Sequence, residues 1–567
     1  MLKGIAASEG IGIGKAMKVS AAPLVIEYRK PENPETEIAR FKNALQVFCD
    51  NTEELAAELA ETAGAKDAEI LRGHIQMIGD PFISSQIEEK IKSGHCAEDA
   101  CEQVLDSFIQ MFESTGDELT IQRAADISDI KNRIIRILSG VPEIDFSKAP
   151  VGTVILTDEL TPSMTVGITK DRIKGIVTEK GGYTSHSAIL SRNLEIPAVL
   201  SVPNVLSLIG NGDELIVDGI TGNVITVPSE QEKELYLQKA QDFQDRKEKL
   251  KAFIGLPSAA ASGEVKEVFA NIGSPADSVT AKGDDAEGIG LFRTEFLYME
   301  RNAAPTEDEQ FIAYKKAAET FRDRPVIIRT LDIGGDKEIP YMHMEKEDNP
   351  FLGFRAVRYC LKDKALFKTQ LRALLRAGAY GNIRIMIPMI TTLKEVREVK
   401  KLKRACCREL AAEKAVFNPD TPLGIMVETP AASLIADLLA KEVDFFSIGT
   451  NDLIGYTMAA DRGNSKVADL YTPYDPAVLR SIQHICRCAG EAGIPVGMCG
   501  EAAANPALIP LLLAFGLDEF SVSHEKVLET RYNLSLWTME EAKRVSEHAM
   551  ALDNAKDIKA YLTGARK

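Results

Sequence analysis

The C-terminal half of this chain carries eight short apolar runs, and helix-like segments separate most of them. The runs, all beyond residue 258, are VFANIG, GIGLFRT, VIIRTLD, IRIMIPM, LGIMVET, FFSIGTN, PVGMCGE and EFSVS. Eight alternating strand–helix units within about 300 residues are typical of a (β/α)8 TIM barrel. Residues 258–567 are therefore predicted to form such a barrel, with its chemistry at the C-terminal ends of the strands.

Charged residues recur where the predicted barrel strands end. Glu428 and Asp452 follow neighbouring strands, and two carboxylates that leave positions open for substrate oxygens suit Mg²⁺. Arginine presents a fork of donors that fits phosphate and carboxylate groups, and the arginines near these ends are Arg293, Arg329 and Arg462. The pattern favours an anionic substrate at this face. For any single arginine, an internal salt bridge explains the residue about equally well.

Cys499 also ends a predicted strand, in the segment GMCGE. A thiol in this place can donate a proton to a substrate, although a lone cysteine in a barrel is more often buried and inert. A thiol that donates a proton in one direction and removes it in the other needs a pKa near the working pH. The residue type and its position leave both interpretations open.

A second candidate site lies far from the barrel, at His186. The run IKGIVTE is predicted to be a strand, Gly181-Gly182 follow it, and the chain then reads as helical until Pro197. His186 is therefore expected at a helix N-terminus, where unpaired amides and the helix dipole attract anions and keep the imidazole neutral and nucleophilic. Thr184 and Ser185 are able to cap this helix. A purely structural histidine is the ordinary alternative.

The segments before the barrel indicate further domains. Five strand-like runs lie between 148 and 228, and residues 1–20, too short to fold alone, are predicted to complete this α/β domain. Apolar residues spaced three, four or seven apart predict a helical bundle inserted at 21–147. Charged, helix-favouring residues dominate 229–257 and predict a long solvated linker helix. The predicted fold is thus a multidomain α/β protein.

The run Gly10-x-Gly12-x-Gly14 resembles part of a dinucleotide-binding fingerprint. That motif needs a strand before it and a helix after it, but the following AMKVS reads as another strand. Paired strands whose backbones approach closely are predicted here instead of a nucleotide site.

Composition argues against several classes of partner. A net charge of −17 opposes binding to nucleic acid, whose affinity rests on Lys and Arg. No N-terminal segment has the pattern of a signal peptide, and no apolar run reaches the roughly 18 residues of a membrane span, so no membrane insertion is expected. Nine cysteines without a C-x-x-C pair indicate reduced thiols and a cytoplasmic location.

Together these segments resemble enzyme I of the bacterial phosphotransferase system, the phosphoenolpyruvate–protein phosphotransferase family, over essentially the whole chain. GGYTSHSAILSRNLEIPAV resembles the family's phosphohistidine signature, which implies that His186 is phosphorylated. GIGLFRTEFLYM and VIIRTLDIGGDK resemble segments that bind phosphoenolpyruvate, which implicates Arg293 and Arg329. GIMVETPAA and FFSIGTNDL resemble the metal-binding segments, which implies that Glu428 and Asp452 hold Mg²⁺.

Other segments add residues to the resemblance. AADRGN and NPFLGFRAVR imply that Arg462 and Arg355 belong to the substrate site, and GMCGE implies that Cys499 is the proton donor. TPSMT resembles the stretch in which Thr165 supports the phosphohistidine, together with Thr184. The full set implied to bind substrate is Arg293, Arg329, Asn451, Asp452, Arg462 and Arg355.

The resemblance implies an activity and a division of the chain. The protein would transfer the phosphoryl group of phosphoenolpyruvate to its own histidine and then to a small HPr-like phosphocarrier, releasing pyruvate, as the first step of sugar phosphotransfer. Residues 1–20 and 148–228 would form the phosphohistidine α/β domain, 21–147 the inserted helical domain that binds the carrier, and 229–257 the linker helix. Residues 258–567 would bind phosphoenolpyruvate and form a homodimer.

The sequence departs from the family pattern at several places. Tyr183 stands where an arginine is usual, Met164 replaces a glutamate, Gly455 replaces a glutamine, and the segment 471–475 is altered. Tyr183 and the altered segment 471–475 leave open a sensor or scaffold that binds phosphoenolpyruvate without passing phosphate on. The related dikinases and phosphoenolpyruvate synthases need an additional ATP-grasp domain, for which no stretch of this chain remains.

Overall fold

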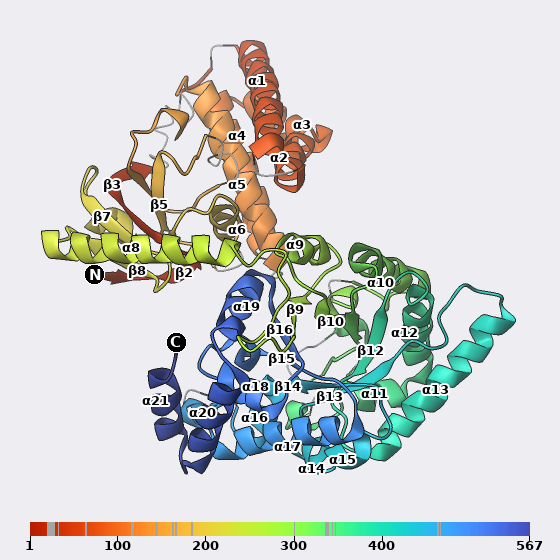
Figure 1. The fold of residues 1–567 in the computed structure, drawn as a ribbon. Coiled ribbons are helices and arrows are strands. Elements are labelled where there is room, and N and C mark those ends of the chain that lie inside the picture. Colours follow the sequence, from red (N-terminus) through yellow and green to blue (C-terminus); the bar gives the residue numbers. More distant parts are fainter. Residues whose placement is uncertain are drawn as a thin grey trace. The chain divides into compact units, whose positions relative to one another are not determined.

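The fold is that of a computed structural model, which divides into two compact units, Met1–Lys247 and Glu248–Lys567 (Figure 1). It describes residues 1–567 except 20–28, 32, 63–64, 115–117, 142–145, 162–163, 165–166, 183–184, 300, 335–338, 343, 346, 462–463 and 465. Each unit is described by itself.

The first unit contains an eight-stranded mixed sheet with the order β1-β8-β7-β3-β4-β5-β6-β2. Its strands are β1 (Leu2–Lys3), β2 (Ile5–Ser8), β3 (Ile11–Val19), β4 (Thr153–Thr157), β5 (Ile173–Thr178), β6 (Ala198–Leu200), β7 (Glu214–Asp218) and β8 (Asn223–Thr226). β3 to β6 run parallel, and the other pairings are antiparallel. The N-terminal segment therefore contributes three strands to one sheet with the strands that flank His186.

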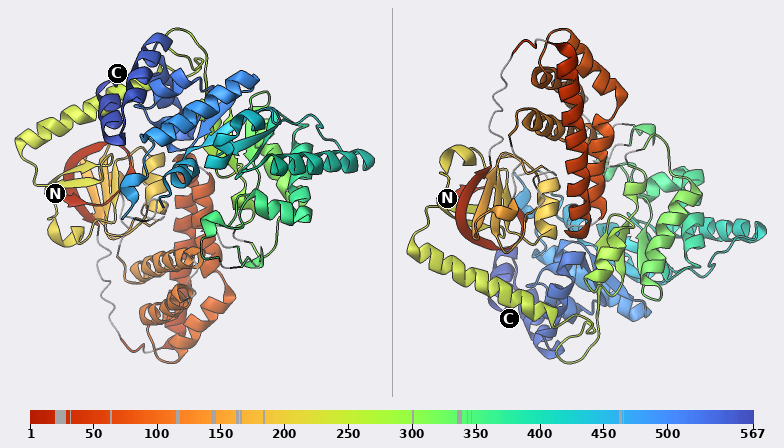
Figure 2. Two further views of the ribbon diagram at one scale, coloured as in Figure 1. Left: turned by 90° about the horizontal axis from the view of Figure 1, so that it is seen from below. Right: turned by 90° about the horizontal axis from the view of Figure 1, so that it is seen from above.

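A single glycine joins the two edges of this sheet. Only Gly4 separates β1 from β2, although these strands stand at opposite ends of the strand order. The Gly4 amide donates to the carbonyl of Gly222 at 2.9 Å, and a side chain at Gly4 would overlap the Leu200 carbonyl oxygen. The sheet therefore curves until its edges meet, and this curvature is visible in Figure 2.

Gly12 and Gly14 both lie inside β3, where successive alternate residues face the same side of the sheet. A Cβ atom at Gly12 would overlap the carbonyl oxygen of Lys174, and one at Gly14 would overlap that of Gly152. The next described helix begins only at Pro34. The glycines thus permit close backbone approach, as predicted, but β3 pairs with β4 and β7 rather than with its sequence neighbour β2.

Five described helices lie between β3 and β4 in the sequence: α1 (Pro34–Thr62), α2 (Ala65–Ile78), α3 (Pro81–Lys92), α4 (Ala97–Glu113) and α5 (Glu118–Leu138). Asp80 begins α3 by accepting a hydrogen bond from the amide of Phe82 at 2.8 Å. Gly94, with φ of +105°, lies in the turn before α4. Buried residues such as Phe41 and Phe48 join these helices around their own apolar core.

The stretch after β8 forms one long helix, α8 (Glu230–Lys251), which has no buried residue. Glutamates occupy its first turn and lysines its last, which suits the helix dipole. The division between the two units falls inside this helix. None of the helices in the described part of the chain could cross a lipid bilayer.

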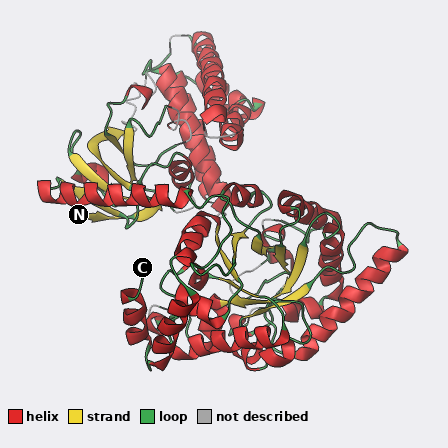
Figure 3. Ribbon diagram, viewed as in Figure 1, coloured by secondary structure: helices red, strands yellow, loops and turns green. Residues whose placement is uncertain are grey.

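The second unit is a closed barrel of eight parallel strands, drawn in yellow inside its red helices in Figure 3. The strands are β9 (Glu267–Ile272), β10 (Ile289–Arg293), β11 (Val326–Arg329), β12 (Ile383–Ile387), β13 (Leu423–Val427), β14 (Phe446–Gly449), β15 (Val496–Cys499) and β16 (Glu519–Ser523). Pairing of Phe520 with Val268 is among those that close the barrel between β16 and β9. Each predicted apolar run coincides with one strand, although β9 begins one residue before its run, and the TIM-barrel prediction is confirmed.

Helices cover the outer side of the barrel and share one large apolar core with it. They are α9 (Asp277–Gly283), α10 (Glu307–Phe321), α11 (Val357–Lys362), α12 (Lys364–Ala377), α13 (Leu393–Ala412), α14 (Pro430–Leu434), α15 (Ala436–Leu439), α16 (Thr450–Met458), α17 (Pro476–Ala492), α18 (Ile509–Phe515), α19 (Val527–Ser535), α20 (Met539–Ala551) and α21 (Ala555–Gly564). Capping boxes begin α10, α13 and α20. They fix where these helices start, and so how long the preceding loops are.

Two glycine substitutions test the backbone packing of the first unit. Gly12→Ala should lower the free energy of unfolding by about 1–3 kcal/mol or more, because the new methyl overlaps the Lys174 carbonyl. Gly73→Ala, inside α2 with no atom within 4 Å of its Cβ, should raise it by up to about 1 kcal/mol. Urea unfolding of both variants checks this, and equal effects would contradict the close approach at Gly12.

Candidate functional site

The predicted barrel residues gather at one end of the barrel. Arg293, Arg329 and Cys499 are the last residues of β10, β11 and β15, and Glu428 directly follows β13. Asn451 and Asp452 lie in the first turn of α16, just after β14. Because all eight strands are parallel and the barrel is closed, these positions share its C-terminal face.

Two buried arginines share one aspartate at this face. The Arg329 guanidinium donates to Glu295 Oε1 at 2.9 Å and lies 3.0 Å from Asp332 Oδ2. Arg355 Nη2 donates to both carboxylate oxygens of Asp332 at 3.1 Å, and to Asp452 Oδ2 at 3.4 Å. Burial lowers the pKa of both guanidinium groups, but the surrounding carboxylates outweigh it and raise each pKa above its usual value.

These ion pairs hold the guanidinium groups of Arg329 and Arg355 in place. Breaking a buried ion pair by removing one partner typically costs about 3–5 kcal/mol, because the other charge stays uncompensated. The resemblance included Arg355 in the substrate site, and the structure joins this residue to Arg329 through Asp332. Glu295 and Asp332 were not among the predicted residues. Their only sequence signal is that each is an acid two or three positions beyond a strand-ending arginine.

Arg293 differs from the other two arginines because its side chain is exposed. Within the described part of the chain it has no hydrogen-bonding or ionic partner. A guanidinium at the end of a barrel strand without an internal carboxylate is available to a phosphate or carboxylate ligand. The arrangement therefore combines two preordered arginines with one free arginine.

Glu428 is 1% exposed and is held by the backbone of the preceding βα loop. The amide of Met389, a non-glycine residue with φ of +57°, donates to Glu428 Oε1 at 2.6 Å. The adjacent Thr429 hydroxyl donates to a carbonyl of the same loop at 2.9 Å. Burial raises the pKa of Glu428 well above its usual range, and the negative charges of Asp452 and Asp332 add to the shift.

The carboxylates of Glu428 and Asp452 suit a hard divalent cation. A buried carboxyl with a raised pKa, close to another carboxylate, gains its negative charge most easily when a cation neutralises it. No group of three or more His, Cys, Asp or Glu side chains able to hold a metal occurs among the described residues. Two carboxylates without further protein ligands fit Mg²⁺, which keeps several waters and binds substrate oxygens.

Cys499 is 4% exposed and lies beside β14. The Ser447 hydroxyl donates to its sulfur at 3.4 Å, and the thiol donates to the Ile448 carbonyl at 3.8 Å. Burial raises the pKa of the thiol to about 12, the Ser447 hydrogen bond opposes this shift, and the charge of Glu428 adds to it. This pKa lies above the working range expected from sequence because of the burial. The thiol is therefore in the protonated form that can donate.

His186 begins helix α6 (His186–Asn193) in the first unit. Ser185 is the N-cap, and its hydroxyl accepts a hydrogen bond from the amide of Ala188 at 3.3 Å. Gly181 has φ of +104°, and its carbonyl accepts from the Ser201 hydroxyl at 2.6 Å. The local sequence thus turns sharply from β5 and places residue 186 in the first turn of a helix, as predicted.

Several predicted residues cannot be placed in this description. Thr165, Thr184, Tyr183 and Arg462 lie outside the described residues, and the side chain of His186 is not described either. The interpretations attached to them remain predictions.

Some of the residues that depart from the family pattern are described by the structure, and their contacts can be given. Met164 packs against the apolar core on one side of the N-terminal sheet. A Cβ at Gly455 would meet nothing closer than 3.5 Å, so its helix has room for a side chain. Tyr471, in the altered segment, donates from its hydroxyl to the Asn451 carbonyl at 2.9 Å. The altered segment therefore contacts the backbone of a predicted substrate residue.

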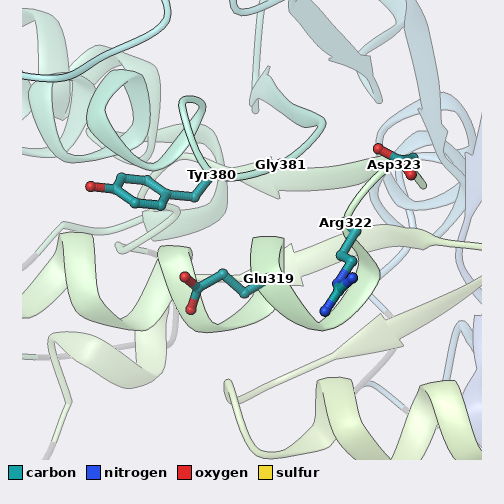
Figure 4. A pocket seen from close by; sticks show the side chains of 5 residues that line it. All are labelled: Glu319, Arg322, Asp323, Tyr380 and Gly381. Atoms are coloured by element: carbon teal, nitrogen blue, oxygen red, sulfur yellow. The ribbon is translucent and has the colours of Figure 1, made fainter.

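An open cavity of about 510 Å³ lies at the other end of the barrel. Its lining residues are Glu319, Arg322, Asp323, Tyr380 and Gly381. They come directly before β11 and β12, and their side chains point in different directions in Figure 4. The cavity is separate from the residues at the C-terminal face and brings no set of polar groups together.

A buried acid lies deeper inside the barrel, at Glu519 in the first position of β16. It is 6% exposed, and its Oε1 has no hydrogen-bond partner in the described structure. Gly290 and Gly497 leave room for its carboxyl group, since a Cβ at either would overlap it. Burial raises its pKa to about 8, and the charge of Glu267 contributes.

Glu519→Gln should make stability less dependent on pH. The folded-state pKa of about 8 exceeds the ordinary value of 4.5, so the contribution of Glu519 is fully present below pH 4.5 and is lost as pH rises through 8. Between pH 4.5 and pH 9, the unfolding free energy of the variant should therefore gain about 3–5 kcal/mol relative to the unsubstituted protein. Chemical unfolding at several pH values measures this, and parallel curves for the two proteins would refute it.

Three family models match successive parts of the chain. Residues 247–538 match the model described as "PEP-utilising enzyme, PEP-binding domain". Residues 3–123 match "PEP-utilising enzyme, N-terminal", and residues 149–222 match "PEP-utilising enzyme, mobile domain". The barrel face and the His186 helix thus lie in separately matched segments.

Curated relatives match almost the whole chain. The phosphoenolpyruvate-protein phosphotransferase of Bacillus sp. (strain S) is 45% identical over 562 residues, covering 99% of this chain and 97% of the relative. The protein of the same name from Bacillus subtilis (strain 168) is 42% identical over 562 residues, covering 99% of both. An NMR solution structure of an enzyme I protein is 38% identical over 43% of this chain and its own full length, with a TM-score of 0.38.

Proposed function

The chain belongs to the family of phosphoenolpyruvate–protein phosphotransferases, and we propose that it moves the phosphoryl group from phosphoenolpyruvate at the barrel face to His186. From there the group passes to a small HPr-like phosphocarrier protein, and pyruvate is released. The observation that carries this proposal is the meeting of the Arg329–Asp332–Arg355 network with Glu428 and Cys499 at one barrel face.

Phosphoenolpyruvate carries a phosphate and a carboxylate, which guanidinium groups bind through paired hydrogen bonds. Arg329 and Arg355 are already oriented by Asp332, so they need little reorganisation when charge develops on the substrate. Arg293 is free to close on the anion from the exposed side. The residues proposed to bind substrate are Arg293, Arg329, Arg355, Asn451, Asp452 and Arg462.

We propose Glu428 and Asp452 as the residues that hold Mg²⁺. The chemistry that Mg²⁺ would supply when held by these carboxylates is neutralisation of the negative charge on the substrate oxygens. The Met389 amide occupies one oxygen of Glu428 and orients the carboxyl group, and Arg355 approaches one oxygen of Asp452. The remaining carboxylate oxygens are the ones available to a cation.

The transfer forms a bond between phosphorus and an imidazole nitrogen of His186 while the bridging P–O bond breaks. The electrons of that bond leave with enolpyruvate, and Cys499 supplies the proton that its carbon takes up. His186 lies in the first turn of α6, where unpaired amides favour an attached phosphate. His186 and the barrel belong to different units, and we propose that the phosphohistidine domain moves between the barrel and the carrier, with α8 as the linker.

The same proposal assigns the domains. Residues 1–20 and 148–228 form the moving phosphohistidine domain, and the match of 149–222 to a mobile domain supports this. The helical segment 21–147 binds the carrier, 229–257 links the two halves, and 258–567 binds substrate and forms a homodimer. We propose a cytoplasmic location, where thiols stay reduced, and no disulfide joins any of the nine cysteines.

His186→Ala should abolish phosphorylation of the protein, because no other residue is proposed to accept the group. Binding of phosphoenolpyruvate should stay within about twofold, since His186 and the substrate residues belong to separate units of the chain. Incubation with labelled phosphoenolpyruvate and Mg²⁺, followed by acid treatment, measures the label. His95→Ala, a substitution in the helical segment, is the control and should retain it. Acid-labile label on the His186→Ala variant would overturn the assignment of His186. If the protein without substitutions acquires no label, the sensor alternative is favoured.

Glu428→Gln and Asp452→Asn should each weaken Mg²⁺ binding and slow phosphorylation on the order of a hundredfold or more, through lost charge stabilisation. Binding of Mn²⁺ as a paramagnetic substitute checks the metal site without reference to activity. Glu395→Gln removes a carboxylate that caps α13. This control should lower stability and leave the metal titration unchanged. Unaltered titrations in both test variants would rule out the proposed ligands.

A further inference from the structure

The sulfur of Cys499 has apolar surroundings inside the barrel. It packs with Leu291, Ile327, Met386, Met426 and Phe445. Its two hydrogen-bonding contacts with described residues are both to β14, namely the Ser447 hydroxyl at 3.4 Å and the Ile448 carbonyl at 3.8 Å. The carbonyl can only accept a hydrogen bond, so Ser447 is the donor that remains when the thiol has lost its proton.

Ser447 is completely buried in the middle of β14. A buried hydroxyl is costly unless it makes a hydrogen bond, and the partner of this hydroxyl is the Cys499 sulfur. Position 447 faces the barrel interior together with Phe445 two residues earlier. The buried Ser447 hydroxyl therefore finds its hydrogen-bond partner in the Cys499 sulfur.

We propose that Ser447 is a positioning residue for Cys499, which orients its thiol and stabilises the thiolate left after proton transfer. This inference rests on the proposed role of Cys499 as the acid. In the forward step the S–H bond breaks, and its proton joins the methylene carbon of enolpyruvate as the enol electrons form the C–H bond. Sulfur keeps the electron pair. In reverse, the thiolate removes a proton from the pyruvate methyl group.

A hydrogen bond to a charged acceptor is stronger than one to a neutral acceptor, so the Ser447 hydroxyl favours the thiolate over the thiol. The other groups that act on this sulfur are Arg329, which also favours the thiolate, and Glu428 and Glu519, which oppose it. Burial opposes it most of all. Loss of the Ser447 donor should therefore impair proton removal from pyruvate more than phosphorylation of the protein.

Exchange of solvent deuterium into the pyruvate methyl group, followed by NMR with the full-length enzyme and Mg²⁺, tests this directly. Ser447→Ala should exchange on the order of tenfold to a hundredfold more slowly, as expected for a hydrogen bond to a charged group. Ser521→Ala is the matched control. Ser521 is equally buried and lies opposite Cys499 on β16, but its hydroxyl donates to Asn271 Oδ1 at 2.6 Å. Its exchange should be close to that of the unsubstituted enzyme.

A second pair of variants separates the effect of the hydroxyl group on exchange from the effect of side-chain packing. Ser447→Thr and Ser447→Val introduce side chains of the same shape, of which only threonine retains a hydroxyl. Exchange should be markedly faster in the threonine variant than in the valine variant at equal melting temperature. Equal exchange in these two variants would overturn the proposal even if Ser447→Ala does not fold.

Alkylation of Cys499 by iodoacetamide, followed by mass spectrometry of its peptide, reads the thiolate directly. At fixed pH, Ser447→Ala should react about tenfold more slowly for each unit by which the thiol pKa rises. A merely structural role predicts the reverse, because a looser barrel would expose the sulfur and speed the reaction. Faster alkylation in Ser447→Ala would therefore count against the proposal.

The Cys499→Ala variant, measured in the same assay, distinguishes a failure of the proposed acid role of Cys499 from a failure of the proposed role of Ser447. If this variant exchanges pyruvate protons as fast as the unsubstituted enzyme, Cys499 is not the acid, and the proposed function fails at that step. If Cys499→Ala is slow while Ser447→Ala behaves like Ser521→Ala, the acid role stands and the role of Ser447 is refuted.

Discussion

Closure of the barrel by the pairing of β16 with β9 is the constraint on which the site depends. It brings the ends of eight parallel strands to one face and so concentrates charged residues in a buried space. Such charges are tolerated only when they are paired. Asp332 meets this requirement by bridging Arg329 and Arg355, and Glu295 completes the pairing of Arg329. The fold thus brings charged side chains close together, and the carboxylates of Asp332 and Glu295 stabilise the buried arginines.

Much of this architecture could be predicted because it depends on local sequence patterns. The eight apolar runs predicted the barrel, and the helical periodicity before them predicted the inserted helices. The polar residues at the strand ends predicted most of the C-terminal face of the barrel. The roles of Asp332 and Met389 could not be predicted in this way. Asp332 acts by touching a guanidinium 23 positions away, and the Met389 amide reaches a carboxylate 39 positions away. Sequence spacing carries no direct record of such contacts.

In the N-terminal unit, the proposed site depends on the position of the backbone rather than on paired charges. Gly4 lets the two edges of the sheet meet, Gly12 and Gly14 let β3 lie against neighbouring backbone, and Gly181 turns the chain into the helix that starts at His186. None of these positions contributes a functional side chain. They hold the N-terminus of α6 beside the sheet, which is the arrangement that the proposed phosphohistidine requires. The exposed helix α8 then separates this unit from the barrel along the chain.

Glu428 and Glu519 show why residue type alone could not define the site. Both are buried glutamates of the barrel interior, and burial raises the pKa of each. Glu519 begins its strand and faces two glycines, without a hydrogen bond to Oε1 from any described residue. Glu428 follows the end of its strand, accepts a hydrogen bond from Met389 and stands near the carboxylate of Asp452. The same side chain is therefore a protonated core residue at one end of the barrel and a cation ligand, as proposed, at the other. Its neighbours across the closed barrel, rather than its chemistry in isolation, decide between these states.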